Sequence, residues 1–325
     1  MRVNTPITHI IEWLVAAICL GANAVASAQG YPNRAVKMVV PFPPATAGDQ
    51  IARIIGPQLQ ERLGQPFVVE NRSGALGTIG AAEVARSVPD GYTVLLTTNT
   101  TQAGAVALVK SLPYDPAKDF APIMRLVTTS MVLLVRSDFP AQALGEFLAY
   151  ARAKSRVLTG AYSTAGSQVS IAKLKALGNF SAIDVPYKGP TLAVSDVLAG
   201  HVSFTFADFA VALAQMKGGK LKGLGVTSLT RTPLAPEIPA ISETLPGFET
   251  VLWFGLVAPA GTAREIVIRL NSAVLEGLSK PEVKARFDGL GLTIAPLSPD
   301  EFSRYIKSEI SKWTEEAKEA GIQPE

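Results

Sequence analysis

The chain has 325 residues, a formal net charge of +3 and 48% hydrophobic residues, of which few are aromatic. The positive charges are spread along the chain without a basic tract, which argues against a nucleic-acid-binding surface. The length is sufficient for two domains that each have a core.

Residues 1–28 have the features of a cleaved export signal. Arg2 lies near the start, an apolar stretch runs from Trp13 to Leu20, and residues 26–28 form a small-x-small cleavage sequence. The apolar stretch is shorter than the ~20 residues that span a bilayer, so a retained membrane anchor is the less favoured alternative. Cleavage would remove Cys19 and His9, and the mature chain would have no thiol. We therefore expect neither a metal site nor a cofactor.

The first structured segment is predicted to be a strand, a loop and a helix. Residues 35–40 form an apolar strand, and Ile51, Ile54 and Leu59 lie on one face of a helix that opens at Gln50. The loop over residues 41–49 is rich in proline and small residues. The first N–H groups of a helix lack internal partners and attract an anion, and Asp49 is predicted to cap them. For this segment alone, an ordinary turn without a ligand remains the alternative.

The rest of the chain alternates predicted strands and helices, which indicates an α/β fold with mainly parallel sheet. The further strands are expected at residues 67–70, 92–97, 131–135, 157–162, 183–189, 202–206 and 251–257. Several of them end in small or polar loops. Three helices near the C-terminus are predicted to start with capping boxes at Thr262, Ser279 and Ser298, each followed three residues later by glutamate.

The sequence offers few catalytic residues. A Ser-His-Asp triad would need His201, which lies in a predicted turn and is better explained as a solvated histidine. The chain contains no P-loop, no H-E-x-x-H and no G-x-S-x-G sequence. A secreted, metal-free hydrolase that uses Ser163 or a pair of carboxylates remains an alternative, although it lacks a credible base.

Several short segments, in order and spacing, are similar to those of one known family. They are Val40–Pro44 with Asp49, Arg62–Pro66, Val69–Arg72, Pro89–Tyr92, Leu112–Pro116 with Lys118–Phe120, Val185–Gly189, Gly219–Leu221, Val226–Ser228 and Trp253–Gly261. With these segments, nearly the whole mature chain resembles the Bug-type extracytoplasmic solute receptors of tripartite tricarboxylate transporters.

The resemblance implies a type II periplasmic binding protein, in which two α/β lobes joined by crossing hinge strands hold a ligand between them. Lobe 1 would comprise residues 29–128 and 251–325, and lobe 2 residues 129–250. The protein would be a periplasmic monomer that binds a small carboxylate, without enzymatic activity, and delivers it to a membrane permease. A secreted sensor that acts through a signalling partner is an alternative with the same fold.

The resemblance also implies which loops bind the ligand. The expected ligand-binding residues are Phe42, Pro43, Ala45, Thr46, Ala47, Gly48, Asp49, Thr98, Asn99, Thr100, Ser163, Thr164, Ala165, Gly166, Ser167, Tyr187, Lys188, Gly189 and Asp208. Family members usually have two glycines where this chain has Ala45 and Thr46. We therefore expect a backbone with less freedom there and an additional polar contact from the Thr46 hydroxyl.

Overall fold

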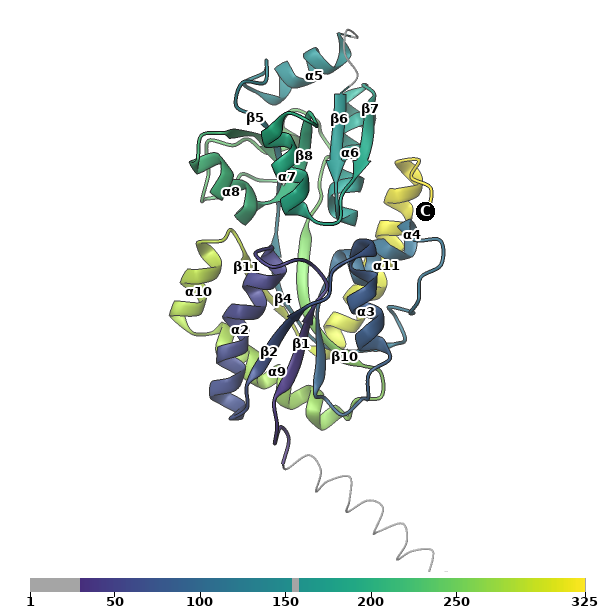
Figure 1. Ribbon diagram of the computed structural model, residues 1–325, viewed down its shortest axis with the longest axis vertical. Coiled ribbons are helices and arrows are strands. Elements are labelled where there is room, and N and C mark those ends of the chain that lie inside the picture. The colour runs from purple at the N-terminus through teal and green to yellow at the C-terminus, as the bar shows by residue number, and fades with distance from the viewer. Residues whose placement is uncertain (1–29, 154–157, 325) are drawn as a thin grey trace, which may run out of the picture.

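The computed structural model of the chain describes residues 30–153 and 158–324, which form two lobes, each built on one β-sheet (Figure 1). The strands are β1 (Val36–Val40), β2 (Phe67–Asn71), β3 (Thr93–Thr98), β4 (Phe120–Thr129), β5 (Met131–Arg136), β6 (Leu158–Tyr162), β7 (Ala182–Pro186), β8 (Phe204–Asp208), β9 (Leu221–Val226), β10 (Leu252–Pro259) and β11 (Thr293–Leu297). The α-helices are α2 (Ala47–Leu63), α3 (Thr78–Ala85), α4 (Ala105–Leu108), α5 (Leu144–Arg152), α6 (Ala165–Gly178), α7 (Pro190–Ala199), α8 (Phe209–Lys217), α9 (Arg264–Leu278), α10 (Pro281–Asp288) and α11 (Pro299–Glu319). Short helical turns lie at η1 (Ala75–Gly77), η2 (Thr100–Gly104) and η3 (Ile241–Glu243).

The predicted signal peptide at residues 1–28 lies outside the described residues. Across the described ranges, every helix is too short or too polar to cross a membrane.

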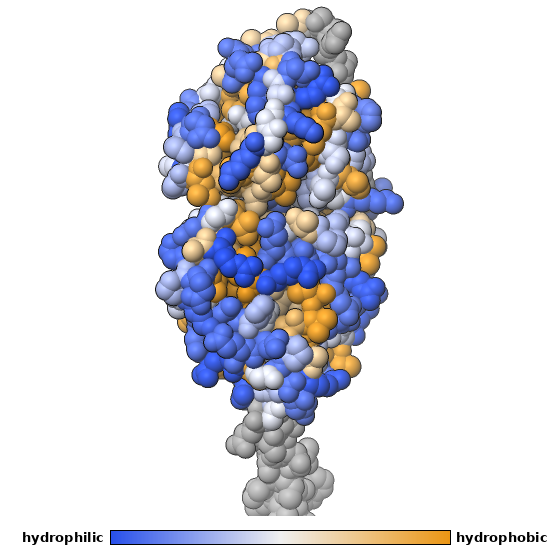
Figure 2. Space-filling model, turned by 60° about the vertical axis from the view of Figure 1, so that its left-hand side comes forward, coloured by the Kyte–Doolittle hydropathy of each residue, from blue (hydrophilic) through white to orange (hydrophobic). Residues whose placement is uncertain are grey.

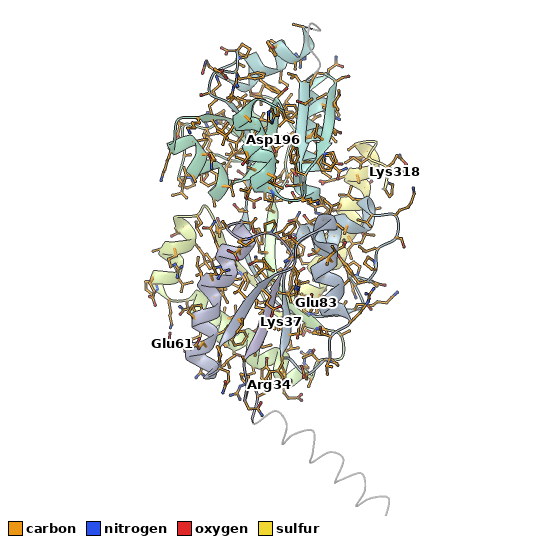
Figure 3. All side chains as sticks on the ribbon, viewed as in Figure 1. Arg34, Lys37, Glu61, Glu83, Asp196 and Lys318 are labelled. Carbon is orange, nitrogen blue, oxygen red and sulfur yellow. The ribbon has the colours of Figure 1, made fainter. Side chains whose placement is uncertain are left out.

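The sheet of the first lobe has the strand order β11-β4-β10-β3-β1-β2 and is covered by helices on both faces. Successive residues of a strand point to opposite faces, so Met38 shares a core with α2 and α9 while Val39 shares one with α3 and α11. Lys37 points to the same side as Val39, and its ammonium forms an ion pair of 2.7 Å with Glu83 on α3 (Figure 3). The first lobe is therefore a three-layer structure.

The second lobe repeats this arrangement with the strand order β7-β6-β8-β5-β9. Leu133 of β5 packs in a core that includes residues of α5 and α6, whereas Val132 and Leu134 pack with α7 and α8. Both faces of the central strands are thus buried, which explains their uninterrupted apolar sequences.

Both sheets are mixed, so the prediction of mainly parallel sheet is wrong. β1 pairs in parallel with β2 and β3, but β10 is antiparallel to both β3 and β4. In the second lobe β5 is antiparallel to β8 and β9. The crossings between the lobes cause this difference, because β3 runs toward the second lobe while β10 returns from it.

The chain crosses between the lobes in two segments that lie beside each other (Figure 1). The first crossing is the junction of β4 and β5, where Ser130 alone separates the two strands. The second crossing runs from Thr250 into β10, and Thr227, which follows β9, lies beside both crossings. The N–H of Thr227 donates to the carbonyl of Met131, and the N–H of Met131 donates to the Thr227 hydroxyl, each over 2.9 Å. Thr227 also exchanges two hydrogen bonds with Thr250, so buried hydrogen bonds join the two crossings through this residue.

Helix α11 forms a third connection, since its C-terminal half reaches the second lobe. Trp313 packs with Ala165 and Val169 of α6. The ammonium of Lys173, also on α6, lies 2.8 Å from the carboxylate of Glu316 on α11. The final helix is therefore part of the contact between the lobes.

Only one of the three predicted capping boxes is present. The carboxylate of Glu301 accepts hydrogen bonds from the N–H and the hydroxyl of Ser298 at the start of α11. Helices α9 and α10 each begin one residue later than predicted, and the hydroxyls of Thr262 and Ser279 instead donate to backbone carbonyls that precede them.

Candidate ligand-binding site

A small cavity lies between the lobes, at the carboxyl ends of β1, β3 and β8. Its lining comprises Phe42, Thr46, Gly48, Thr98, Asn99, Thr100, Thr164, Pro190, Asp208, Leu252 and Phe254. The volume of this cavity is about 20 Å³, which is room for about one water molecule. Ligand pockets commonly measure about 300–1,000 Å³, so the two lobes would have to move apart to admit a small metabolite. The space-filling view shows the constriction between the two lobes (Figure 2).

The predicted residues divide into three groups by position. Those that line the cavity are Phe42, Thr46, Gly48, Thr98, Asn99, Thr100, Thr164 and Asp208. Those that belong to the surrounding loops and helix starts without lining it are Pro43, Ala45, Ala47, Asp49, Ser163, Ala165, Gly166, Ser167 and Gly189. Tyr187 and Lys188 line a different groove, together with Tyr162 and Gln168.

Asp49 holds the first loop in place, and its predicted role as a helix cap is wrong. Helix α2 begins at Ala47, after Thr46, so Asp49 already lies within the first turn. Its carboxylate is only 3% exposed and accepts hydrogen bonds from the Ala45 N–H at 3.0 Å and the Asn71 amide at 3.1 Å. Arg53 donates to the same carboxylate at 3.0 Å. Asp49 therefore fixes the backbone of the loop instead of facing the ligand space.

The pKa of Asp49 reflects these contacts. Burial alone would raise it, but hydrogen bonds from Arg53, Ala45 and Asn71 outweigh burial and lower it below the ordinary value of 3.8. Asp49 is therefore ionised at neutral pH, and its charge is available to hold the loop.

Ala45 and Thr46 have distinct roles in the first loop. Ala45 has a φ of +65°, a left-handed conformation that glycine adopts without strain. The hydroxyl of Thr46 donates to the carbonyl of Pro43 at 2.8 Å. This hydrogen bond stabilises the loop, and Thr46 also lines the cavity.

A cluster of threonines fixes the loop after β3. The Thr98 hydroxyl accepts hydrogen bonds from the N–H groups of Thr100 and Thr101, and the Thr101 hydroxyl lies 2.9 Å from that of Thr97. The hydroxyl of Tyr114 donates to the Thr101 carbonyl at 2.7 Å. The loop thus presents Asn99 and Thr100 to the cavity in a defined position.

The second lobe contributes the starts of α6 and α7. Thr164 caps α6, because its hydroxyl accepts from the Ser167 N–H at 3.1 Å. Gly189 precedes α7 and lies against Pro43 of the first lobe: a Cβ at Gly189 would be 2.9 Å from the Pro43 Cγ. The two lobes therefore meet closely at this edge of the cavity.

The starts of helices from both lobes converge on the cavity. It is lined by residues at the N-terminus of α2 from the first lobe, and at those of α6, α7 and α8 from the second. Each helix start carries about half a positive charge and N–H groups without intrahelical partners. None of the lysines or arginines in the described part of the chain lines the cavity. Any positive potential in the cavity therefore comes from the main chain, which suits an anion.

Tyr187 and Lys188 line a second groove of about 350 Å³, which also lies between the lobes because Leu76 and Leu108 of the first lobe line it too. Lys188 is exposed, and the Tyr187 hydroxyl donates to the Asp196 carboxylate at 2.6 Å. Burial and Asp196 together raise the pKa of Tyr187 to about 12. The sequence could not distinguish this second groove from the cavity, because residues at the ends of strands line both.

Asp208 is the ionisable residue of the cavity lining. It is the last residue of β8 and is 9% exposed. Burial raises the pKa of its carboxyl from 3.8 to about 6. Among the described residues, none donates a hydrogen bond to this carboxylate.

Three lining residues were not predicted from the sequence. Pro190 directly follows the predicted Gly189. Leu252 and Phe254 lie two residues apart on β10 and point into the cavity, while Trp253 between them packs with α11. Every residue of β10 is buried, so both faces of this strand are apolar. The sequence therefore did not show which face of β10 points to the cavity.

His201 lies far from the cavity. It follows α7, whose first residue lines the cavity, and a ten-residue helix is about 15 Å long. The imidazole is exposed and its Nδ1 lies 3.5 Å from the Asp196 carboxylate, which is labelled in the second lobe (Figure 3). The described part of the chain also contains no cluster of three or more potential metal-ligating His, Cys, Asp or Glu residues.

Comparisons with known proteins agree with this architecture. The family model described as "Tripartite tricarboxylate transporter family receptor" matches residues 51–322. The structure of the periplasmic binding protein BugD is similar with a TM-score of 0.86 and 33% identity, covering 91% of this chain and 100% of that one.

Two similar structures contain carboxylates. Rpa4515 of R. palustris, solved with adipate, has a TM-score of 0.88 and 33% identity, covering 91% of this chain and 100% of its own. MatC of Rhodopseudomonas palustris, solved with malate, has a TM-score of 0.82 and 34% identity, covering 88% and 99%. The fold is that of a periplasmic binding protein, and the chain belongs to the tripartite tricarboxylate transporter receptor family, with Bug-type relatives.

Proposed function

We propose that the protein is a periplasmic receptor that captures a small carboxylate in the cavity between its lobes and delivers it to a tripartite tricarboxylate-type permease. The single observation that carries this proposal is the convergence of four helix N-termini, from both lobes, on a small cavity without a cationic side chain. A ligand that contacts both lobes favours the closed arrangement, which couples binding to a change in shape.

Main-chain groups are sufficient for useful affinity. A hydrogen bond to a charged group contributes about 1.5–3 kcal/mol, and a helix terminus adds up to ~2 kcal/mol in a partly buried setting. Three or four such hydrogen bonds give about 4.5–12 kcal/mol, a range that includes the roughly 8 kcal/mol of a micromolar complex before the cost of association is subtracted. The malate and adipate in the similar structures support a carboxylate as the ligand.

The binding step is tested with purified mature protein from which any bound ligand has been removed by unfolding and refolding. A thermal-shift screen should contain mono-, di- and tricarboxylates, aromatic acids and amino acids, because a ligand that binds only the folded state raises the melting temperature. Calorimetry with each positive acid and its neutral amide should give at least tenfold weaker binding of the amide. If no acid binds, or if acid and amide bind alike, the proposal is wrong.

The physiological role needs a separate experiment. A deletion strain should lose uptake of the radiolabelled ligand and regain it with the full-length gene. A sensor would instead leave uptake unchanged and abolish a transcriptional response. Chemical conversion of the bound acid by the purified protein, followed by NMR, would show an enzyme instead of a receptor.

A further inference from the structure

Asp208 places an acceptor in a cavity that otherwise attracts anions. Its carboxylate is 9% exposed and lies at the end of β8, where Asp208 directly precedes the first turn of α8. A buried carboxylate normally has a hydrogen-bond donor as partner, because burial of a charge without one is costly. No described residue donates to it, although residues of both lobes surround the same cavity.

Asn99 supplies the complementary group on the opposite lobe. Its side chain is 2% exposed and lines the cavity, and its amide nitrogen Nδ2 is buried without a hydrogen-bond partner among the described residues. The cavity thus contains a donor on the first lobe and an acceptor on the second, both with hydrogen-bonding capacity that the protein itself does not use.

No charged side chain compensates Asp208 from the neighbouring elements. Along β5, Met131 lies opposite Asp208, whereas Arg136 lies at the other end of that strand and pairs with Asp138. Other ionisable groups on elements around the cavity include Asp196 on α7, Lys217 at the end of α8, Lys222 on β9, Lys173 and Lys175 on α6, Lys37 on β1, and Asp49, Arg53, Glu61 and Arg62 on α2. None of these groups lines the cavity, and the pKa of Asp208 is raised by burial without a contribution from a neighbouring charge.

We infer that Asp208 selects ligands that carry a hydrogen-bond donor, a hydroxyl or an ammonium group, next to the carboxylate, so that the receptor prefers hydroxy or amino acids to their unsubstituted analogues. In this arrangement the ligand carboxylate accepts hydrogen bonds from the helix starts and from Asn99. The hydroxyl or ammonium donates to Asp208. This inference rests on the proposed function, because it assigns the ligand class of the same cavity.

Calorimetry on matched acids tests the inference. The panel consists of succinate, malate and aspartate, and of propionate, lactate and alanine. Within at least one series, the hydroxy or amino acid should bind about 10- to 100-fold more tightly than the unsubstituted acid, the range that a hydrogen bond to a charged group supplies. Equal affinities across both series would overturn the inference while leaving carboxylate binding intact. Absence of binding by every acid, including those of the wider screen, would overturn the proposed function as well.

Three variants locate the preference. Asp208→Ala should reduce it to below threefold, whereas Asn99→Ala should weaken all acids of a series by a similar factor and leave the preference unchanged. Asp138→Asn removes an exposed carboxylate from the same lobe and should change neither. Each variant is first checked for a cooperative thermal transition. If Asp208→Ala weakens unsubstituted and substituted acids equally, Asp208 has no role in selection.

The pH dependence of the wild-type protein gives a test that needs no variant. The preference should decrease as the pH falls through about 6, because a protonated Asp208 is a poorer acceptor. The opposite result, tighter binding of succinate below pH 6 with no change for malate and aspartate, would show that Asp208 donates a proton to the ligand carboxylate, and the inference would be wrong.

Discussion

Thr227 and Thr250 join their segments through a reciprocal pair of hydrogen bonds. The Thr227 hydroxyl donates to the carbonyl of Thr250 at 2.7 Å, and the N–H of Thr250 donates to the carbonyl of Thr227 at 2.9 Å. The same hydroxyl accepts from the N–H of Met131 on the other crossing. The buried side chain of Thr227 therefore links its own segment to those of Met131 and Thr250 at the junction between the lobes.

Replacement of Thr227 by valine should destabilise the protein by about 2–4 kcal/mol. Valine has nearly the same shape, but it leaves the Met131 N–H and the Thr250 carbonyl buried without partners, at about 1–3 kcal/mol each. Urea denaturation measures the change. Thr227→Ser keeps the hydroxyl and serves as the control, with a loss of at most about half that of valine. Equal stability of the valine variant and the wild type would contradict this account of the junction.

Ala45→Gly should leave the protein as stable as the wild type or up to about 1 kcal/mol more stable. Relief of the left-handed conformation at Ala45 gains about 1–2 kcal/mol, and the greater freedom of glycine in the unfolded chain offsets about 0.4–1 kcal/mol of it. Ala45→Val should be less stable than the wild type, because a β-branched side chain is more strained there. The side chain of Ala45 is exposed, so the change in stability reports the backbone conformation and not a loss of packing. A stable valine variant would argue against the left-handed conformation.

Asp49 should make the first loop sensitive to acid. Its pKa is lowered in the folded protein, so its contribution to stability is complete above the ordinary value of 3.8 and is lost as the pH falls below it. Asp49→Asn keeps the shape but not the charge, and it should be less stable at pH 7 by about 1–3 kcal/mol. Urea titrations at several pH values should show this difference shrinking below pH 3.8. A difference that is constant with pH would contradict the role of the charge.

Gly189→Ala should weaken ligand binding with little effect on the stability of the unliganded protein. The added Cβ would lie 2.9 Å from the Pro43 Cγ, a distance that forces the two lobes apart. Calorimetry should show about a tenfold loss of affinity, equivalent to about 1.4 kcal/mol. The double variant with Pro43→Ala removes the clashing atom and should regain part of that loss. If the double variant binds no better than the single one, the cause is not this contact.

The ion pair of Lys173 and Glu316 should be worth more than a surface pair. Both side chains are less than one-fifth exposed, and the Lys173 ammonium also donates to the Glu249 carbonyl. A double-mutant cycle with alanine should give a coupling energy of about 1–2 kcal/mol. The pair of Arg264 and Asp300 is 68% and 65% exposed and should give less than about 0.5 kcal/mol in the same cycle. Similar coupling in both cycles would contradict the stabilising effect of burial.

Sequence patterns located the strands whose apolar runs are continuous. The strands β1, β2, β3, β5, β6, β8 and β10 begin and end within two residues of the predicted positions. β4 was missed because Pro122, Arg125 and threonines interrupt its apolar pattern, although this strand leads into the first crossing. β9 was missed because it contains Gly223 and Gly225, which have close contacts with side chains of Met216 and Ile241. Contacts between segments that are distant in the chain leave no pattern in the local sequence, so they could not be predicted from it.

The sequence predicted which loops form the candidate site, but it did not predict which side chains contact each other there. Strand ends and helix starts are local features, so residues such as Thr46, Asn99 and Thr164 were identified in advance. The orientation of Asp49 depends on Asn71, which lies on β2, and the position of Lys188 in the second groove depends on how the lobes meet. The roles of the lining residues in ligand binding and the lobe boundaries at residues 128 and 250 remain predictions.

The proposed anchoring of an anion by helix starts would have a consequence for how such a receptor can diverge. N–H groups belong to every residue except proline, so substitution in the cavity rarely removes them. Side chains such as Phe42, Thr100 and Leu252 can then be exchanged without loss of the carboxylate anchor. A duplicated gene would thus keep its affinity for acids as a class while mutation altered which acid it accepts, and new specificities would arise without an inactive intermediate.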